Sequence, residues 1–339
     1  MRLTRRGWGL VAVVVVAEVL AILHGARALN AVAAPAVIGL AAGAVQVARG
    51  ERPTVDRGAV SPGFPGDRRE VSLDVSGSGV ATVIDRTPAG VTVDPAVADT
   101  TGSATLEATL PTEFTYEVEF AQRGRHEVGP VIVQVRDVLG LVTTEYHVEE
   151  TTVTLVYPPV YQVAGRERLL REILDRDAVE RDEFDELREY VPGDPLRDVH
   201  WKSTAKNPDE MFVTEFADRR IDDSVVLAAS STAGAFSDAM AAAAASVAVM
   251  AIDAGVSVEL RAPSVSVPTG GGVDHRDRLL RALALTDGGH PSPDEMEGVD
   301  VHVHADDDGV TLTLGTLTHD FEEMTVSRAN PLADRGVSA

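Results

Sequence analysis

Two long apolar runs near the amino terminus constrain this chain more than any other feature. They read "WGLVAVVVVAEVLAILH" over residues 8–24 and "AVAAPAVIGLAAGAVQVA" over residues 31–48. Each approaches the length that an α-helix needs to cross about 30 Å of hydrocarbon. We therefore predict a transmembrane hairpin over residues 1–50, with the membrane as the first partner of the chain.

Arginine side chains flank the hairpin unevenly. Three precede the first run, three follow the second, and one lies between them: Arg2, Arg5 and Arg6, then Arg49, Arg52 and Arg57, and Arg27. Positive charge stays on the cytoplasmic side of a membrane, so we expect both ends and the soluble domains to be cytoplasmic. A cleaved export signal is the alternative, because a twin arginine and the small residues Ala26 and Ala28 also fit one.

The charge balance changes sharply after the hairpin. Residues 1–50 carry +4, whereas the 339-residue chain as a whole carries −23. Nearly all basic residues are arginine, since only Lys202 and Lys206 are lysine. Such an acidic, lysine-poor surface is typical of salt-loving organisms, and we expect a halophilic archaeal origin. The same acidic field disfavours nucleic-acid binding.

Alternating polarity dominates the next part of the chain. Residues 51–68 are rich in proline, glycine and charge, which predicts a linker. Over residues 69–160 the period is two: in "EFTYEVEF", Phe114, Tyr116, Val118 and Phe120 fall on one face. About seven short runs of this kind, separated by turn residues, predict a β-sandwich domain.

The second half of the chain mixes helical and strand patterns. Helical spacing over 165–190 predicts a connecting helix within the segment 161–220, followed by a strand at 211–216. Over 221–330 we expect strands at 224–230, 256–261, 299–305 and 309–316, helices at 235–255 and 276–285, and a loop at 263–275. This order predicts a right-handed α/β, Rossmann-type sheet, and residues 331–339 form a tail.

A long motif lies between these two regions. The stretch "FDELREYVPGDPLRDVHWKSTAKNPDEMFVTEF" (184–216) is similar to the signature of the domain of unknown function 58 family. The "D-x-x-G-L" turn at Asp137, Gly140 and Leu141 and two amino-terminal spans are also usual in that family. The signature positions matched are Arg188, Tyr190, Gly193, Asp194, Arg197, Trp201, Lys202, Ala205 and Glu215, and His200 stands for a frequent aspartate.

The resemblance implies an architecture more than a chemistry. Members of the family commonly carry a von Willebrand factor A-like region after the signature, and their genes often accompany MoxR-type AAA+ ATPases. A functional A domain binds a divalent cation through D-x-S-x-S, whereas here Ala228 takes the aspartate place and Ser230 and Thr232 take hydroxyl places. We expect a degenerate site, with no metal and no cofactor bound.

Two other stretches contain residue types that support chemistry in other proteins. His302, His304 and Asp306 share a spacing able to hold a metal, but no third histidine is near in sequence, so we expect a plain strand face. The glycines of "TGGG" (269–272) lack the G-K-[ST] ending of a phosphate loop and predict a flexible connector.

Three functions compete at this point. We favour a membrane-anchored, non-enzymatic scaffold or adaptor that works with a MoxR-type ATPase and uses the signature as a structural or partner-binding face. The alternative is a hydrolase acting on an anionic or envelope substrate, with Asp194 or His200 as acid–base and Arg197 and Lys202 as anion clamps. An extracytoplasmic envelope protein would require the opposite topology.

Overall fold

The protein divides into two compact units in a computed structural model. They comprise residues Met1–Pro159 with Leu332–Ala339, and residues Val160–Pro331. The structure describes residues 1–24, 27–165, 169, 172, 187–189, 212–214 and 224–332.

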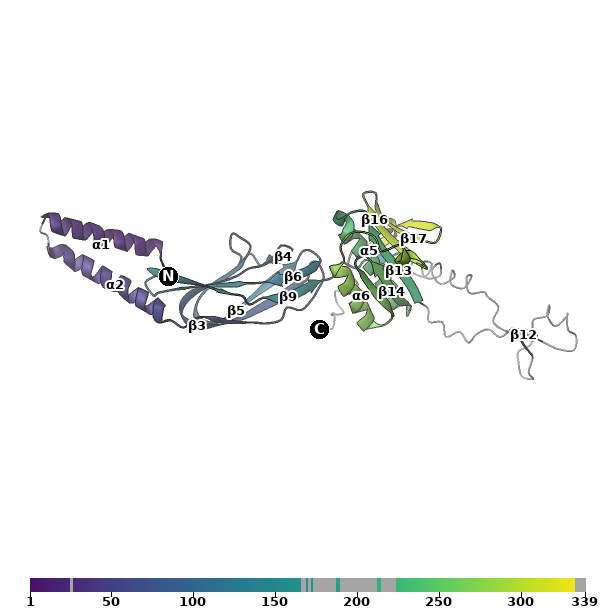
Figure 1. Ribbon diagram of the computed structural model, residues 1–339, viewed down its shortest axis with the longest axis horizontal. Coiled ribbons are helices and arrows are strands. Elements are labelled where there is room, and N and C mark those ends of the chain that lie inside the picture. The colour runs from purple at the N-terminus through teal and green to yellow at the C-terminus, as the bar shows by residue number, and fades with distance from the viewer. Residues whose placement is uncertain are drawn as a thin grey trace. The chain divides into compact units, whose positions relative to one another are not determined.

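The predicted apolar helices open the first unit. Helix α1 (Arg5–His24) and helix α2 (Asn30–Arg49) lie side by side, joined through the 3-10 turn η1 (Arg27–Leu29) (Figure 1). Both are long and apolar enough to cross a membrane. Large apolar side chains such as Val16 and Ile38 are exposed on them, as expected for a lipid-facing surface. The two N-terminal apolar helices are thus confirmed.

Strands form the rest of the first unit. A seven-stranded sheet has the order β1-β8-β7-β3-β5-β4, with β2 paired to β3, and β6 pairs with β9 in a second sheet. The strands are β1 (Arg2–Leu3), β2 (Thr54–Arg57), β3 (Arg68–Asp85), β4 (Val91–Val93), β5 (Ala104–Phe120), β6 (Gly124–Val128), β7 (Val131–Arg136), β8 (Val142–Val148) and β9 (Thr152–Val156). The prediction of a β-sandwich is confirmed at the level of a β-rich domain whose larger sheet curls.

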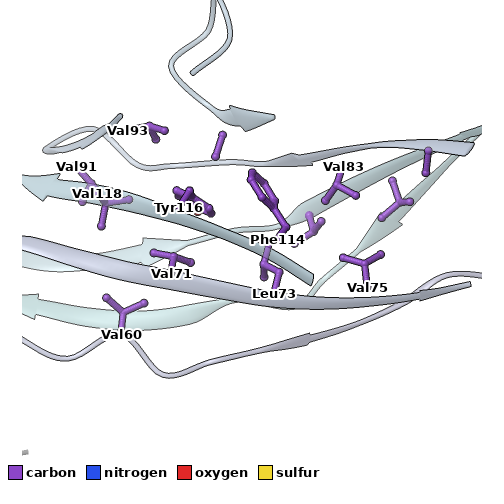
Figure 2. Packing of buried hydrophobic residues seen from close by; sticks show 14 of the residues in the cluster. Val60, Val71, Leu73, Val75, Val83, Val91, Val93, Phe114, Tyr116 and Val118 are labelled. Carbon is purple, nitrogen blue, oxygen red and sulfur yellow. The ribbon is translucent and has the colours of Figure 1, made fainter. Parts of the chain in front are cut away.

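The curled sheet wraps its own apolar core. Strands β3 and β5 pair along nearly their whole length, and their register shifts between Val75 and Gly79. A shift of this kind adds backbone to one strand and increases the local bend. Phe114, Tyr116 and Val118 point inward with Val71 and Leu73 from β3 (Figure 2). The alternation predicted for 113–120 is therefore present, with Phe120 also buried.

The segment 51–68, predicted as a linker, contributes to this core instead. It contains β2, and Val60 and Phe64 are buried. The segment is rich in proline, glycine and charge, so its sequence pattern did not indicate the short strand β2, in which Arg57 points inward. Arg57 lies with its side chain 1 % exposed and donates two hydrogen bonds of 2.7 Å to the buried Asp85 carboxylate.

Tyr116 completes this buried polar group. Its hydroxyl donates to Asp85 Oδ2 at 2.6 Å. Burial, followed by the charge of Asp85, raises the pKa of Tyr116 far above its ordinary value, so the hydroxyl keeps its proton. A bidentate arginine–carboxylate pair with a third hydrogen bond is the geometry in which a buried charge pair is satisfied.

The second unit is built on a six-stranded sheet. Its order is β15-β14-β13-β16-β17-β18, with β13 parallel to both β14 and β16 and the other pairs antiparallel. The elements of this unit are β10 (Gln162–Val163), β11 (Leu187–Glu189), β12 (Phe212–Thr214), β13 (Ser224–Ser231), η3 (Gly234–Phe236), α5 (Ser237–Asp253), β14 (Ser257–Ala262), β15 (Val265–Gly270), α6 (Val273–Leu285), η4 (Asp294–Met296), β16 (Val301–Asp306), β17 (Gly309–Leu314), β18 (Leu317–Asp320), α7 (Phe321–Met324) and β19 (Thr325–Ser327).

One face of this sheet is apolar and buried. It is formed by alternate residues such as Leu227, Leu260, Val303 and Leu312. Helix α5 packs across β13, β14, β16 and β17, and its alanine side chains are buried. This helix is also apolar enough to cross a membrane, but 67% of its apolar stretch is buried inside the protein, which identifies it as a core helix.

Two local predictions for the second unit were wrong. The loop expected at 263–275 contains β15, which pairs with β14 because Val265 and Val267 alternate beside an edge. The end of the helix expected at 165–190 is a strand, since β11 pairs antiparallel with β12. The described strands outnumber the helices, and where we predicted a right-handed α/β sheet the structure has a mixed sheet in which β14, β13 and β16 are parallel.

Replacing Asp85 by asparagine tests the buried charge pair. Arg57 would be left without its counter-charge, and we expect the free energy of unfolding to fall by about 3–5 kcal/mol. Urea unfolding of the full chain in detergent, followed by circular dichroism, measures the change. Glu107→Gln is the matched control, because its ion pair with Arg136 is exposed and should contribute less than about 1 kcal/mol. Equal losses for both variants would contradict the assignment.

Candidate functional site

The second face of the six-stranded sheet is polar. The register of the strands places Ser230 of β13 beside His304 of β16, and Ala228 beside both His302 and Arg261. On the next strand, Thr313 and Thr311 lie opposite the two histidines. The carboxyl ends of the parallel strands β13 and β16 meet at one edge, which is where ligands bind in many sheets of this kind. This polar face is therefore the candidate site within the described residues.

A buried hydroxyl joins two imidazoles at the centre of the polar face. Ser230 Oγ lies 2.8 Å from His302 Nε2 and 2.7 Å from His304 Nδ1. A hydroxyl has one hydrogen to donate, so at least one of these ring nitrogens must carry a hydrogen and donate it to the Ser230 oxygen. Ser230 is 0 % exposed, and both rings are half-buried.

A third histidine, which the sequence did not reveal, covers this pair. His290 stacks on His304 with ring centroids 5.7 Å apart and planes 21° from parallel. It lies in the loop between α6 and η4, twelve positions before His302, so no helix or strand period connects the two. Gly289, which precedes it, holds the loop against β13, because Ser231 N–H donates to the Gly289 carbonyl at 2.7 Å and Ser231 Oγ accepts from Gly289 N–H at 3.2 Å.

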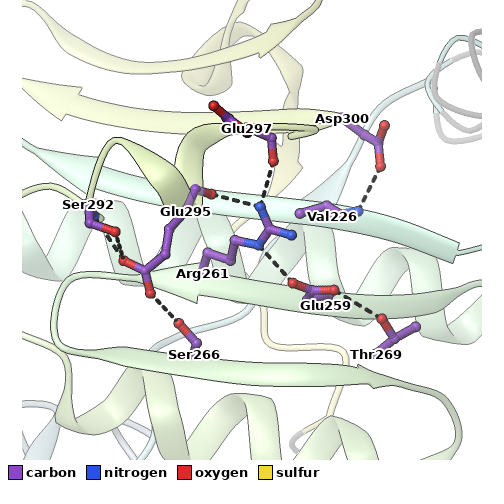
Figure 3. Close-up of polar contacts among 9 residues, drawn as sticks. All are labelled: Val226, Glu259, Arg261, Ser266, Thr269, Ser292, Glu295, Glu297 and Asp300. Atoms are coloured by element: carbon purple, nitrogen blue, oxygen red, sulfur yellow. Dashed lines mark hydrogen bonds and ion pairs between the residues drawn. The ribbon is translucent and has the colours of Figure 1, made fainter.

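Polar contacts fix the rest of this loop over the sheet (Figure 3). Arg261 Nη1 donates to the carbonyl oxygens of Glu295 and Glu297 at 2.8 and 2.7 Å, while its Nε bonds the Glu259 carboxylate. The Glu295 carboxylate accepts from the N–H and hydroxyl of Ser292 and from the Ser266 hydroxyl, and these bonds lower its pKa. Arg261 thus binds the loop by two carbonyls rather than by a side-chain charge.

The environment keeps the central imidazole neutral. Burial, followed by the neighbouring His304 and His290 rings, lowers the pKa of His302. Beyond this pair, His304 Nε2 lies 3.8 Å from Asp306 Oδ2 at the exposed end of β16. The cluster is therefore a hydrogen-bonded group around a neutral His302, with a carboxylate at its rim.

The predicted metal-site positions fall on this face, but they do not converge on an open site. Ala228 presents a buried methyl group, Ser230 is held by the two imidazoles, and Thr232 lies beyond β13 on the surface. In the described part of the chain, the residues whose ligand atoms come within 4.8 Å of one another are Asp306, Asp307 and Asp308, at the β16–β17 turn. The turn's carboxylates face water, which is common without a bound ion.

The structure describes only two short parts of the signature motif, one near each end. Arg188 belongs to β11, whose partner β12 lies just before Glu215, so the structure joins the two ends of the motif by an antiparallel pair. The predicted positions between and beyond these strands lie outside the described residues: Tyr190, Gly193, Asp194, Arg197, His200, Trp201, Lys202 and Glu215.

Residues 186–320 match the family model described as protein of unknown function DUF58. The match supports the DUF58 family for this chain. It begins just before β11 and ends with β18, so it spans the signature and the whole polar face. The sequence pattern of 184–216 and the model agree on the family, whose description names no activity. No curated protein matches the chain.

Solved structures resemble the chain only weakly. A non-cellulosomal cohesin from the archaeon Archaeoglobus fulgidus is 11% identical, covers 31% of this chain and 91% of its own, and has a TM-score of 0.23. A cohesin module from a Clostridium perfringens glycoside hydrolase is 12% identical over 31% and 95%, with a TM-score of 0.21. The Escherichia coli chaperone DraB is 9% identical over 35% and 61%, also at 0.21. Scores of this size carry no conclusion about function.

The lowered pKa of His302 gives a pH dependence. The unfolded side chain titrates near pH 6.5. The contribution of neutral His302 to the free energy of unfolding is therefore fully present above about pH 6.5, and it is lost as pH falls toward the lowered pKa of the folded chain. Exchange of the imidazole C2 hydrogen, followed by mass spectrometry, should give His302 a lower midpoint in the folded chain than in urea. The His304→Asn change should raise this midpoint by removing a like charge, whereas Ser230→Ala should leave it low. An equal midpoint in the folded and unfolded chains would contradict the prediction.

Proposed function

We propose that this protein is a membrane-anchored, non-enzymatic scaffold or adaptor of the DUF58 type. It holds a β domain at the membrane and presents the polar face and the signature of its second unit to a protein partner. From the family resemblance, that partner is a MoxR-type AAA+ ATPase, and the process is the assembly or maturation of other proteins.

The attachment of the apolar hairpin to the β domain is the observation that carries this proposal. Strand β1 directly precedes α1 and pairs with β8 at the edge of the seven-stranded sheet. Leu141, just before β8, is buried in a cluster that includes Leu10 of α1 and Leu40 of α2. A chain that only needed a tether would use a flexible linker, whereas this joint fixes the β domain to the helices.

The polar face supports the non-enzymatic reading. The Ser230–imidazole distances are those of a nucleophile and its base. However, the Ser230 hydroxyl has no exposed surface, and both imidazole contacts are already made. A group that catalyses acyl transfer must reach its substrate, so this cluster fits a structural role in the sheet.

We propose a von Willebrand factor A-like relationship for the second unit as well. The parallel trio β14-β13-β16 and helix α5 support it, while the antiparallel strands β15, β17 and β18 extend the sheet on both sides. With Ala228 in place of a carboxylate, the unit would engage its partner without a bridging cation. The strongly acidic composition supports a halophilic origin.

The arginine flanks support a cytoplasmic location for both soluble units. Arg57 no longer counts among these flanks, since Asp85 neutralises it, but Arg2, Arg5, Arg6, Arg49 and Arg52 still outnumber Arg27. A fluorescent-protein fusion at residue 339 should therefore be fluorescent, and an alkaline-phosphatase fusion there should be inactive. A phosphatase fused at Ala28, between the helices, is the control and should be active. The reverse pattern would establish the opposite topology.

Co-purification tests the partner. The full chain, solubilised from membranes of its own organism, should recover an AAA+ ATPase, and the paired Arg197→Ala and Lys202→Ala changes should reduce the recovery by about tenfold, the effect of about 1.4 kcal/mol. Arg68→Ala is the matched control, because Arg68 is an exposed arginine of the β domain. It should not change the recovery.

The same co-purification, combined with complementation of a deletion strain, distinguishes the scaffold proposal from the hydrolase alternative. Failure to recover an ATPase with the unaltered chain would contradict the adaptor proposal. Loss of complementation of a deletion strain by a folded Asp194→Asn or His200→Gln variant that still recovers the ATPase would favour the hydrolase.

A further inference from the structure

The turn between β7 and β8 has an unusual combination of features. Its residues 137–142, the Asp137 turn, place a nearly fully buried carboxylate beside two exposed apolar side chains. Asp137 is 1% exposed, whereas Val138 is 75% exposed and Leu139 is 58% exposed. A turn at a protein–water surface normally shows polar side chains, so this arrangement points to a different surrounding.

Every backbone N–H group from residue 138 to 142 has a hydrogen-bond acceptor. The Asp137 carboxylate accepts from Leu139 N–H at 3.0 Å, and from Leu141 N–H and Val142 N–H at 2.7 Å each. Gly140 N–H donates to the Asp137 carbonyl, and Val138 N–H donates to Gln46 Oε1 of α2 at 3.4 Å.

The carbonyl groups of Gly140, Leu141 and Val142 are also satisfied. Thr4 Oγ1 donates to the Gly140 carbonyl at 2.6 Å, and Thr4 N–H donates to the Leu141 carbonyl at 2.9 Å. The Val142 carbonyl accepts from Asp137 N–H. Water bonds exposed backbone groups, so internal pairing of this extent is unnecessary at a wet surface. In hydrocarbon each unpaired backbone group is costly, so the pairing of the five N–H groups and these three carbonyls favours an apolar surrounding.

The Asp137 turn lies along helix α2 rather than beyond its end. A Cβ added at Gly43 would lie 2.9 Å from Asp137 Oδ2, and one added at Gly39 would lie 3.7 Å from Leu139 Cδ1. Glycine at position 43 lets the turn approach the helix backbone closely, whereas the contact at Gly39 is an ordinary van der Waals contact. The turn therefore runs along α2 from the level of Gly43 to the level of Gly39.

The position of Gly39 sets how deep the tip of the Asp137 turn, Val138 and Leu139, would lie in the hydrocarbon layer. It lies ten residues before Arg49, the last residue of α2, and a helix rises about 1.5 Å per residue, which places it roughly 15 Å along the helix. The hydrocarbon layer is about 30 Å thick. An exposed tryptophan, Trp8, near the start of α1 fits the membrane–water boundary on the same side.

We propose that the Asp137 turn is a third membrane-inserted element, with the side chains of Val138 and Leu139 in the hydrocarbon beside α2. Its occupant is the lipid bilayer, because these side chains are exposed next to the lipid-facing apolar surface of the hairpin. The inference rests on the span of α1 and α2 in the proposed function. It adds that the β domain enters the bilayer instead of resting on its surface.

Single-cysteine labelling tests the insertion, since the chain contains no cysteine. The full chain carrying Val138→Cys or Leu139→Cys is spin-labelled and reconstituted in phosphatidylcholine–phosphatidylglycerol vesicles. Collisions with oxygen and with a water-soluble nickel chelate are then measured. At both positions we expect loss of the nickel effect and retention of the oxygen effect, because the chelate does not enter hydrocarbon.

Two control positions make the outcome decisive. Ile38→Cys is exposed on α2 next to Gly39 and should behave like residue 139, whereas Val153→Cys, an exposed valine of β9, should respond to nickel. Nickel access at 138 and 139 with a shielded Ile38 would overturn the inference and leave the membrane anchor intact. Nickel access at Ile38 as well would overturn both.

Discussion

The carboxylate of Asp137 makes the contact on which the first unit depends. It accepts three backbone N–H groups of one turn, and this turn is the place where the curled sheet meets the helical hairpin. Without this acceptor, the three N–H groups would be buried without a hydrogen bond, which would destabilise the fold. The pairing of β1 with β8 and the packing of Leu141 between the helices both depend on the shape that this turn gives the chain.

Part of this architecture could be predicted from sequence because it follows a period. The apolar runs 8–24 and 31–48, the alternation at 113–120 and the apolar strand at 224–230 each determine their own burial, whatever surrounds them. The sequence did not predict elements whose structure depends on a partner that is distant in the chain. Arg57 looked like part of a linker because its counter-charge lies 28 residues away, and Leu187–Glu189 looked helical until its pairing with Phe212–Thr214 was known.

The candidate site shows the same division. The positions of His302 and His304 on one strand face followed from their spacing, and the sequence shows directly that position 228 is an alanine. What the sequence could not give was the contact of both rings with Ser230, because Ser230 lies 72 positions before His302 and 74 before His304. Nor could it give His290, whose loop is held by backbone groups and by Arg261, for which no local pattern exists.

The place of β1 in the sheet also sets an order of events during synthesis. Arg2 and Leu3 leave the ribosome roughly 140 residues before their partners Thr143 and Val142. The hairpin would thus be in the membrane well before the last edge of the sheet can close, and loop-closure entropy makes such long-range pairing slow. The β domain would complete its folding against a membrane that already holds both of its anchors.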